Sequence, residues 1–255
     1  MKELIKLEFR KLRKQKSLYI CLCIMLALIL MSAITYKILM ASGMNLGDLP
    51  IDLSAVDGIF FTLTTLSNAD FFIIIGIVIA ITYCFDSEEH TIKNVFARGY
   101  SRSSLFFSKV LSIVCLTTFM FVCCYAFAFV VGTIFFGVGE GNLLSMLGLI
   151  GTQFLACLAY SMFFTFICVL CKKMAVAIAM NIISPLVITL IATLADSLIK
   201  SDAIKISNFW LDGMINNISS LAATSTSIII AIVGAVLYSA IFVFFGAMIS
   251  KDVEA

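Results

Sequence analysis

Charged and hydroxyl side chains gather in the stretch 86–104 of a chain in which only 13% of the residues are charged. The residues of interest there are Glu88, Glu89, Thr91, Ile92, Lys93, Val95, Phe96, Ser101 and Arg102. Ile92, Val95 and Phe96 have i, i+3, i+4 spacing, which predicts a short helix with an apolar stripe, and Gly99 would end it. Ser101 then stands at the expected N-cap of the next helix. The pattern favours a segment that binds a partner protein; a solvated loop between two helices is the alternative.

The sequence contains no recognisable reaction centre. It has no Gly-Lys dipeptide, so a phosphate-binding loop of the form G-x-x-x-x-G-K-[ST] is absent. His90 is the only histidine, and Cys168 and Cys171 form one C-x-x-C pair without a second. That pair is more typical of small buried helix residues than of a metal or redox site. We therefore expect no catalytic residue, no metal site and no cofactor bound by this chain itself.

The composition excludes a water-soluble globular protein. Of the 255 residues 62% are hydrophobic, and the mean hydropathy is +1.13, whereas soluble chains are roughly 45–50% apolar and about 25% charged. Much of the surface must therefore face lipid. The apolar residues form long unbroken blocks instead of the alternating pattern of barrel strands, which predicts an all-α polytopic membrane protein.

Six apolar blocks reach or approach the ~20 residues that a helix needs to cross the hydrocarbon core. They are 18–40, 69–85, 105–136, 143–170, 174–194 and 228–249, and they place residues 17–255 in one transmembrane domain. The second block is short. It could begin earlier, through Ile59–Leu66, at the cost of including Asn68 and Asp70.

An even number of spans puts both termini on one side of the membrane, and the basic residues indicate which side. If the termini are cytoplasmic, 14 of the 17 Lys and Arg residues lie on the cytoplasmic face, and only Lys37, Lys200 and Lys205 lie outside. Cytoplasmic loops of membrane proteins carry an excess of Lys and Arg. We therefore expect cytoplasmic termini, and the stretch 86–104 is then cytoplasmic too.

The leader 1–16 is predicted to be a basic amphipathic helix at the inner membrane interface. At roughly 100° per residue, Met1, Ile5, Phe9 and Leu12 fall on one stripe. The opposite face carries the cations Lys2, Lys6, Arg10, Arg13 and Lys14. Such a helix places its apolar stripe in the acyl boundary and its cations near anionic headgroups; a simple topology anchor is the alternative.

The middles of the predicted spans are nearly free of charge. Ion-coupled carriers usually keep ionisable residues at membrane depth, where a charge costs about 2.5–3.5 kcal/mol, so a secondary carrier is the less favoured interpretation. Asn181 is among the strongest polar groups there, and Pro185 is predicted to kink the fifth span near it as a possible gate. The spans suit a hydrophobic or amphipathic cargo. The outer segment 195–227 is too polar to span and is predicted to lie at the outer interface, with Trp210 as its anchor.

The stretch 86–104 resembles the signature that follows the second span of type-2 ATP-binding-cassette (ABC) permeases. The matching residues are Glu88-Glu89-x-Thr91-Ile92-Lys93, then Gly99-Tyr100-Ser101-Arg102, then Lys109. The sequence departs from that pattern at His90, where a Gly is usual. The basic leader, the six spans and the polar segment before the last span also fit the family. Arg98-Gly-Tyr-Ser-Arg102 is most similar to small permeases that export peptides, including lantibiotic-immunity and phenol-soluble-modulin exporters.

This resemblance implies a transport subunit in a bacterial cytoplasmic membrane that exports a hydrophobic or amphipathic substrate, and a peptide is the expected substrate. Two copies of a separate ATPase would bind ATP and Mg²⁺, and a second permease copy, identical or related, would complete a dimer. The residues named above in the stretch 86–104 would couple to the ATPase. The leader would be the connecting helix, through Ile5, Phe9, Arg10, Leu12 and Arg13. No nucleic acid partner is implied, and an ATP-independent carrier or a membrane scaffold is the alternative.

Overall fold

A computed structural model describes residues 2–42, 57–65, 67, 69–88, 99, 101–139, 143–171, 173–199, 205–219 and 223–252. These residues form helices and connecting turns, and no strand occurs among them. In chain order the helices are α1 (Lys2–Lys14), α2 (Lys16–Ser42), α3 (Gly58–Thr65), α4 (Ala69–Glu88), α6 (Arg102–Phe136), α7 (Leu143–Cys171), α8 (Met174–Ile199), the 3₁₀ helix η2 (Ile206–Phe209), α9 (Leu211–Ile218) and α10 (Ser225–Asp252). The prediction of an all-α polytopic membrane protein is confirmed.

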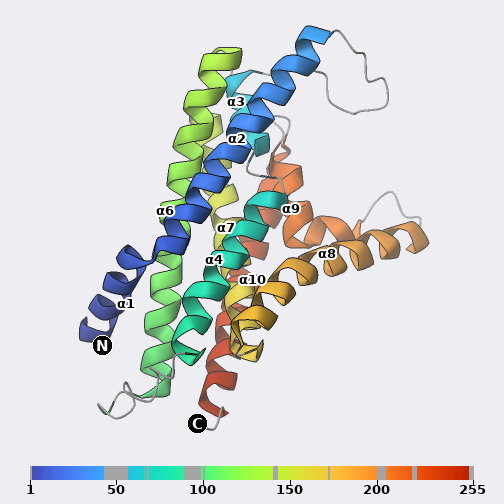
Figure 1. Cartoon of the computed structure of the whole chain (residues 1–255). Helices are drawn as coiled ribbons and strands as arrows, with labels where there is room; N and C mark the ends of the chain where they lie inside the picture. The colour runs from blue at the N-terminus through green and yellow to red at the C-terminus, as the bar shows by residue number, and fades with distance from the viewer. Residues whose placement is uncertain are drawn as a thin grey trace.

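Five of these helices are long and apolar enough to cross a membrane. They contain the segments Lys16–Ala41, Arg102–Phe136, Ser145–Cys171, Met174–Ile199 and Ser225–Ser250. The second predicted span differs, because the apolar part of α4 is only Phe71–Phe85. The earlier residues considered for that span form the separate helix α3. Asp57 precedes this helix and caps its first turn, since its Oδ1 accepts a hydrogen bond from the backbone N–H of Phe60 at 2.7 Å. α3 lies toward one end of the bundle and α4 extends toward the other (Figure 1), so these residues form two helices and not one long span.

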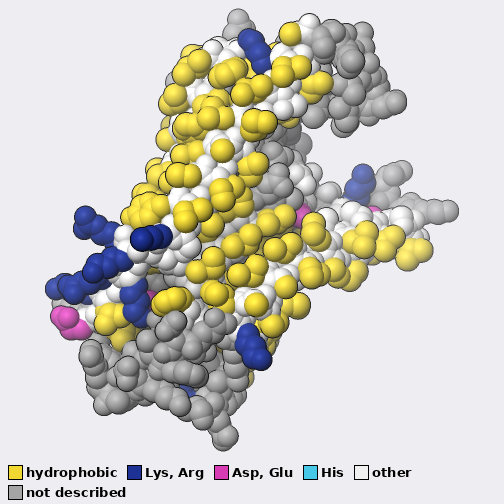
Figure 2. Space-filling view, viewed as in Figure 1, with side chains coloured by type: hydrophobic (Ala, Val, Ile, Leu, Met, Phe, Trp, Pro, Cys, Tyr) yellow, Lys and Arg dark blue, Asp and Glu magenta, His cyan; other side chains and the backbone are white. Residues whose placement is uncertain are grey.

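The helices pack around α7. α8 contacts α4 and α7, and its later turns extend away from the other helices (Figure 1). In α7, 67% of the candidate span is buried inside the chain, against 17% in α8 and 11% in α10. α10 packs along α7, and α1 lies at the same end of the bundle as the last turns of α10 (Figure 1). Hydrophobic side chains cover the outward face of α2 and α8 (Figure 2). A surface of this kind is stable only against lipid or another apolar surface.

The segment before the last helix packs into the bundle. A helix at the outer interface was expected, and α9 does form, but Leu211, Met214, Ile215 and Ile218 are each buried. They are covered because α9 packs against α7 and α10. Trp210, directly before α9, makes edge-on ring contacts with Phe163 of α7 and Tyr238 of α10, with centroids 5.6 and 5.8 Å apart. Its role as an interfacial anchor stays a prediction.

Glycines allow α3 to lie close against the end of α6. The backbone N–H of Gly58 donates to the carbonyl oxygen of Gly137 at 2.9 Å, and Gly137 has a φ of +81°, which a residue with a side chain adopts with difficulty. A Cβ at Gly58 would lie 2.5 Å from that carbonyl oxygen. A Cβ at Gly132 would lie 2.9 Å from the carbonyl oxygen of Gly58. The two backbones can approach this closely only where side chains are absent.

Replacing Gly58 with Ala is expected to lower the free energy of unfolding by about 1–3 kcal/mol, because the added methyl group overlaps backbone that cannot move freely. The measurement is thermal unfolding of the purified chain in mild detergent. Gly151→Ala is the matched control, since a Cβ there meets nothing within 4 Å and Ala favours a helix. Equal melting temperatures for the two variants would contradict the close α3–α6 contact.

Candidate functional site

The predicted partner-binding stretch lies between the end of α4 and the start of α6. Glu88 is the last residue of α4, and Arg102 is the first of α6. Outside the described residues are Glu89, Thr91, Ile92, Lys93, Val95 and Phe96. Gly99 has a φ of +82°, as suits a glycine at the end of a helix or in a turn. The predicted N-cap at Ser101 is confirmed, since its Oγ accepts a hydrogen bond from the backbone N–H of Ser104 at 3.3 Å.

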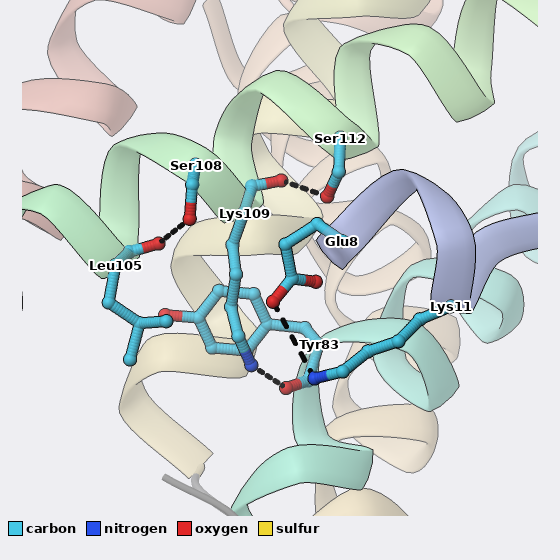
Figure 3. A network of polar contacts seen from close by, with 7 residues as sticks. All are labelled: Glu8, Lys11, Tyr83, Leu105, Ser108, Lys109 and Ser112. Atoms are coloured by element: carbon cyan, nitrogen blue, oxygen red, sulfur yellow. Dashed lines mark hydrogen bonds and ion pairs between the residues drawn. The ribbon is translucent and has the colours of Figure 1, made fainter. Parts of the chain in front are cut away.

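Lys109 connects the start of α6 to the end of α4. Its side chain is buried, with 4% of its surface exposed. The ammonium Nζ donates to the carbonyl oxygen of Tyr83 at 2.8 Å and lies 4.7 Å from the centre of the Tyr83 ring (Figure 3). A buried ammonium is stable only when such partners replace its lost water. Lys109 therefore holds the two helices that flank the predicted partner-binding stretch at a fixed separation.

Helix α1 adds a buried acid to the same place. Glu8 is 4% exposed, and one of its carboxylate oxygens lies 3.7 Å from the ammonium of Lys11. Figure 3 shows Glu8 on α1 beside Lys109 and Tyr83. Leu4 and Leu12, one turn before and one turn after Glu8, are also buried. The face of α1 that covers the neighbouring helix is therefore Leu4, Glu8 and Leu12, because α1 packs against α6.

This buried face differs from the apolar stripe expected from the sequence. Of the expected stripe, Leu12 is buried, Ile5 is half-buried and Phe9 is 40% exposed. A helical wheel assigns charged residues to the exposed face. Glu8 is nevertheless buried, because α1 packs against α6 on this side and the carboxylate is paired with Lys11. Arg10 and Arg13 are exposed, and cations gather on the surface at this end of the molecule (Figure 2). The exposed Phe9 and the cations remain available for a membrane surface or for a partner.

The chain bends between α1 and α2 at Gln15, and this bend is also connected to α4. The hydroxyl of Thr82 donates to Oε1 of Gln15 at 3.2 Å. The backbone N–H of Gln15 donates to the carbonyl oxygen of Leu12 at 3.2 Å, which closes the last turn of α1. We call the place where α1, the end of α4 and the start of α6 meet the basal junction, and we define it by Glu8, Gln15, Thr82, Tyr83 and Lys109.

The predicted gating residues lie elsewhere, where α8 meets α4. Asn181 is fully buried, and its Nδ2 donates to the carbonyl oxygen of Gly76 at 2.9 Å and to Sγ of Cys168 at 3.6 Å. Pro185 is buried within α8. Asn181 therefore joins three helices, while its role in gating, with that of Pro185, stays a prediction.

The basal junction has no arrangement suited to bond-making chemistry. Its groups are one ammonium, one carboxylate, an amide and hydroxyls, and no set of three or more His, Cys, Asp or Glu residues able to hold a metal ion occurs in the described part of the chain. Its geometry instead links three helices mechanically. The sequence pointed to Lys109 through the family pattern but did not reveal Glu8, Gln15, Thr82 or Tyr83. The one available signal was Glu8 lying between Leu4 and Leu12 at helical spacing.

Comparison with known families places the chain in a family of membrane transporters. The family described as ABC-2 family transporter protein matches residues 4–196, a range that runs from α1 almost to the end of α8 and includes the whole basal junction. Comparison with curated proteins returned no match.

Replacing Lys109 with Met should lower the free energy of unfolding by about 1.5–3 kcal/mol, the usual contribution of a hydrogen bond to a charged group. The measurement is chemical or thermal unfolding in detergent. Lys37→Met is the matched control, since Lys37 on α2 also donates to a carbonyl oxygen, that of Phe135 at 2.7 Å, and lies 5.8 Å from the Phe136 ring, but on an exposed surface. The control should cost about 1 kcal/mol or less. A larger loss from Lys37→Met than from Lys109→Met would contradict the importance of the basal junction.

Proposed function

The chain belongs to the ABC-2 family of transporter proteins, and from this premise we propose that it is the membrane subunit of an exporter driven by a separate ATPase. A permease of this family is the membrane component of an ABC transporter and not itself the ATPase. The sequence agrees, because it contains no phosphate-binding loop. ATP and Mg²⁺ would be bound by the partner, in two copies, and a second permease subunit would complete the transporter.

The observation that carries this proposal is the basal junction. A partner that pushes on residues 89–100 acts on the end of α4 and the start of α6, since these helices are continuous with that stretch. The Lys109 contact with Tyr83 then prevents the two helices from separating. The force is therefore passed into the length of both helices instead of being lost in a local bend.

α1 should move with the same body. It packs on α6 through Leu4, Glu8 and Leu12, and the bend that follows it is joined to α4 through Gln15 and Thr82. α2 continues directly from that bend. Closure of the ATPase pair on ATP would therefore displace α1, α4 and α6 together, and α2 would follow. Alternation between inward-facing and outward-facing states would result.

The cargo is proposed to be a hydrophobic or amphipathic molecule, best represented by a peptide, that leaves the cytoplasm of a bacterium. Support comes from the apolar side chains of the helices and from the resemblance of Arg98–Arg102 to peptide exporters. The Lys and Arg bias favours a cytoplasmic position for the basal junction and for both termini. The exposed cations of α1 suit an anionic inner leaflet.

The test is affinity purification from the native membrane in mild detergent, followed by mass spectrometry. An ATPase of about 25–35 kDa, the size of a single nucleotide-binding subunit, should accompany the chain. Replacing Ile92, Val95 and Phe96 together with Asp should remove that ATPase, because the apolar stripe of the docking segment would become charged. Val138→Asp, at an exposed position beyond the far end of α6, is the control and should retain it.

Retention of transport by the triple variant, or the consistent absence of any ATPase, would contradict the proposal and favour an ATP-independent carrier or a scaffold.

Lys109→Met is expected to leave the ATPase bound while transport per ATP hydrolysed falls several-fold, since the helices could then move separately. The measurement is ATPase activity and substrate efflux from the same proteoliposomes. Lys37→Met should keep the normal ratio. A proportional loss of hydrolysis and transport in Lys109→Met would show impaired assembly and would contradict a role in coupling.

A further inference from the structure

The carboxylate of Asp212 contacts two long helices, α7 and α8, near their midpoints. Asp212, in the first turn of α9, accepts hydrogen bonds from the hydroxyl of Tyr160 at 2.8 Å and from the hydroxyl of Thr189 at 2.5 Å. Each carboxylate oxygen receives one of these bonds. Asp212 is partly exposed, so it remains reachable, whereas Tyr160 is fully buried. The proposed basal machinery makes no use of this group.

The depth of Asp212 follows from its partners. Tyr160 lies near the middle of α7, and Thr189 lies near the middle of α8. Tyr238 lies near the middle of α10, and its hydroxyl donates to the carbonyl oxygen of Phe209 at 3.2 Å. Phe209 directly precedes Trp210 in the sequence. α9 packs against α7 and α10, and Figure 1 shows it away from both ends of the bundle. The segment 209–212 therefore reaches the central part of three helices.

Among the residues that the structure describes, no basic side chain is paired with Asp212. Both of its hydrogen-bond donors are neutral hydroxyls. Ionisable groups inside a membrane are costly and usually mark a pathway or a ligand site. A cation supplied from outside the chain would neutralise the remaining charge.

Aromatic rings pack around Tyr160, one of the two hydrogen-bond donors to Asp212. The Tyr160 ring stacks on Phe72 with centroids 4.6 Å apart and meets the edge of Trp210 at 6.4 Å. Trp210 also contacts Phe163 and Tyr238. Aromatic faces attract organic cations through the ring quadrupole, and tryptophan does so most strongly. A carboxylate beside aromatic rings suits an ammonium or guanidinium group attached to an apolar body better than it suits a hydrated metal ion.

We propose that Asp212, together with the aromatic side chains of Tyr160 and Trp210 beside it, binds the cationic group of an amphipathic cargo, an alkylammonium or a guanidinium. The inference rests on the proposed function, because it names the charge of the molecule that the exporter moves. Its apolar body would lie against the exposed apolar surface of α8, which continues on both sides of Thr189 through Leu186 and Leu190.

The alternative is that Asp212 serves only as a structural link that holds α9 against α7 and α8. Asp212→Asn separates the two, because Asn has nearly the same size and can still exchange hydrogen bonds with both hydroxyls. A structural link survives this change largely intact. A cation site loses its charge.

Trp210 is the only tryptophan in the chain, so intrinsic tryptophan fluorescence of the purified full-length protein reports on this place alone. The experiment titrates dodecyltrimethylammonium into the protein in a non-ionic detergent and uses dodecanol as the uncharged comparison. The wild type should give a saturable change with the cation only. Asp212→Asn should bind about tenfold more weakly, as expected for loss of one charged partner worth about 1.4 kcal/mol.

Asp196→Asn is the matched control, since Asp196, in the last turns of α8, is also partly exposed and also accepts two hydrogen bonds, but from the backbone N–H groups of Ile206 and Ser207, away from the aromatic rings that contact Tyr160. It should bind as the wild type does. Equal titrations of the wild type and Asp212→Asn, or equal responses to dodecanol and the cation, would overturn the inference. Both outcomes are independent of the ATPase, so co-purification of the ATPase would still support the proposed function if cation binding failed.

Discussion

A lysine ammonium with almost no exposed surface is the constraint on which the basal junction depends. Removing a charge from water is costly unless protein groups replace the water. For Lys109 those groups are the carbonyl oxygen and the ring of Tyr83 on the neighbouring helix. The position of Lys109 thus determines how far the end of α4 lies from the start of α6. Glu8 brings a second buried charged residue to the junction from α1.

Charged groups also link separate helices elsewhere in the molecule. Lys37 of α2 donates a hydrogen bond to the backbone of α6. Asp212 of α9 accepts hydrogen bonds from side chains of α7 and α8. Between these links the helices are held by close packing, as where Gly58 of α3 meets Gly132 of α6. A few polar links at defined positions thus supplement apolar packing over most of the helix contacts.

The positions of the long helices could be predicted from the sequence because a span is a local property, set by the length and hydropathy of one block. The N-cap at Ser101 is equally local and was predicted correctly. The separate helix α3, the buried face of α1 and the partners of Asp212 could not be predicted, because each depends on residues far away in the chain. The carbonyl oxygen of Gly137 accepts a hydrogen bond from Gly58 of α3, and α6 packs against the face of α1 that carries Glu8. Asp212 accepts hydrogen bonds from Tyr160 and Thr189.

The central claim is that α1, α4 and α6 move as one body, and a cross-link across the basal junction tests it most directly. Gln15 and Thr82 are hydrogen-bonded at 3.2 Å, so Gln15→Cys with Thr82→Cys can be joined by a short thiol-specific reagent, with Cys21 and Cys23 replaced by Ala to prevent side reactions. ATP-driven efflux from proteoliposomes is then measured before and after cross-linking. The account predicts that transport continues at close to its original rate. Loss of transport on cross-linking, restored when the link is reduced, would contradict it.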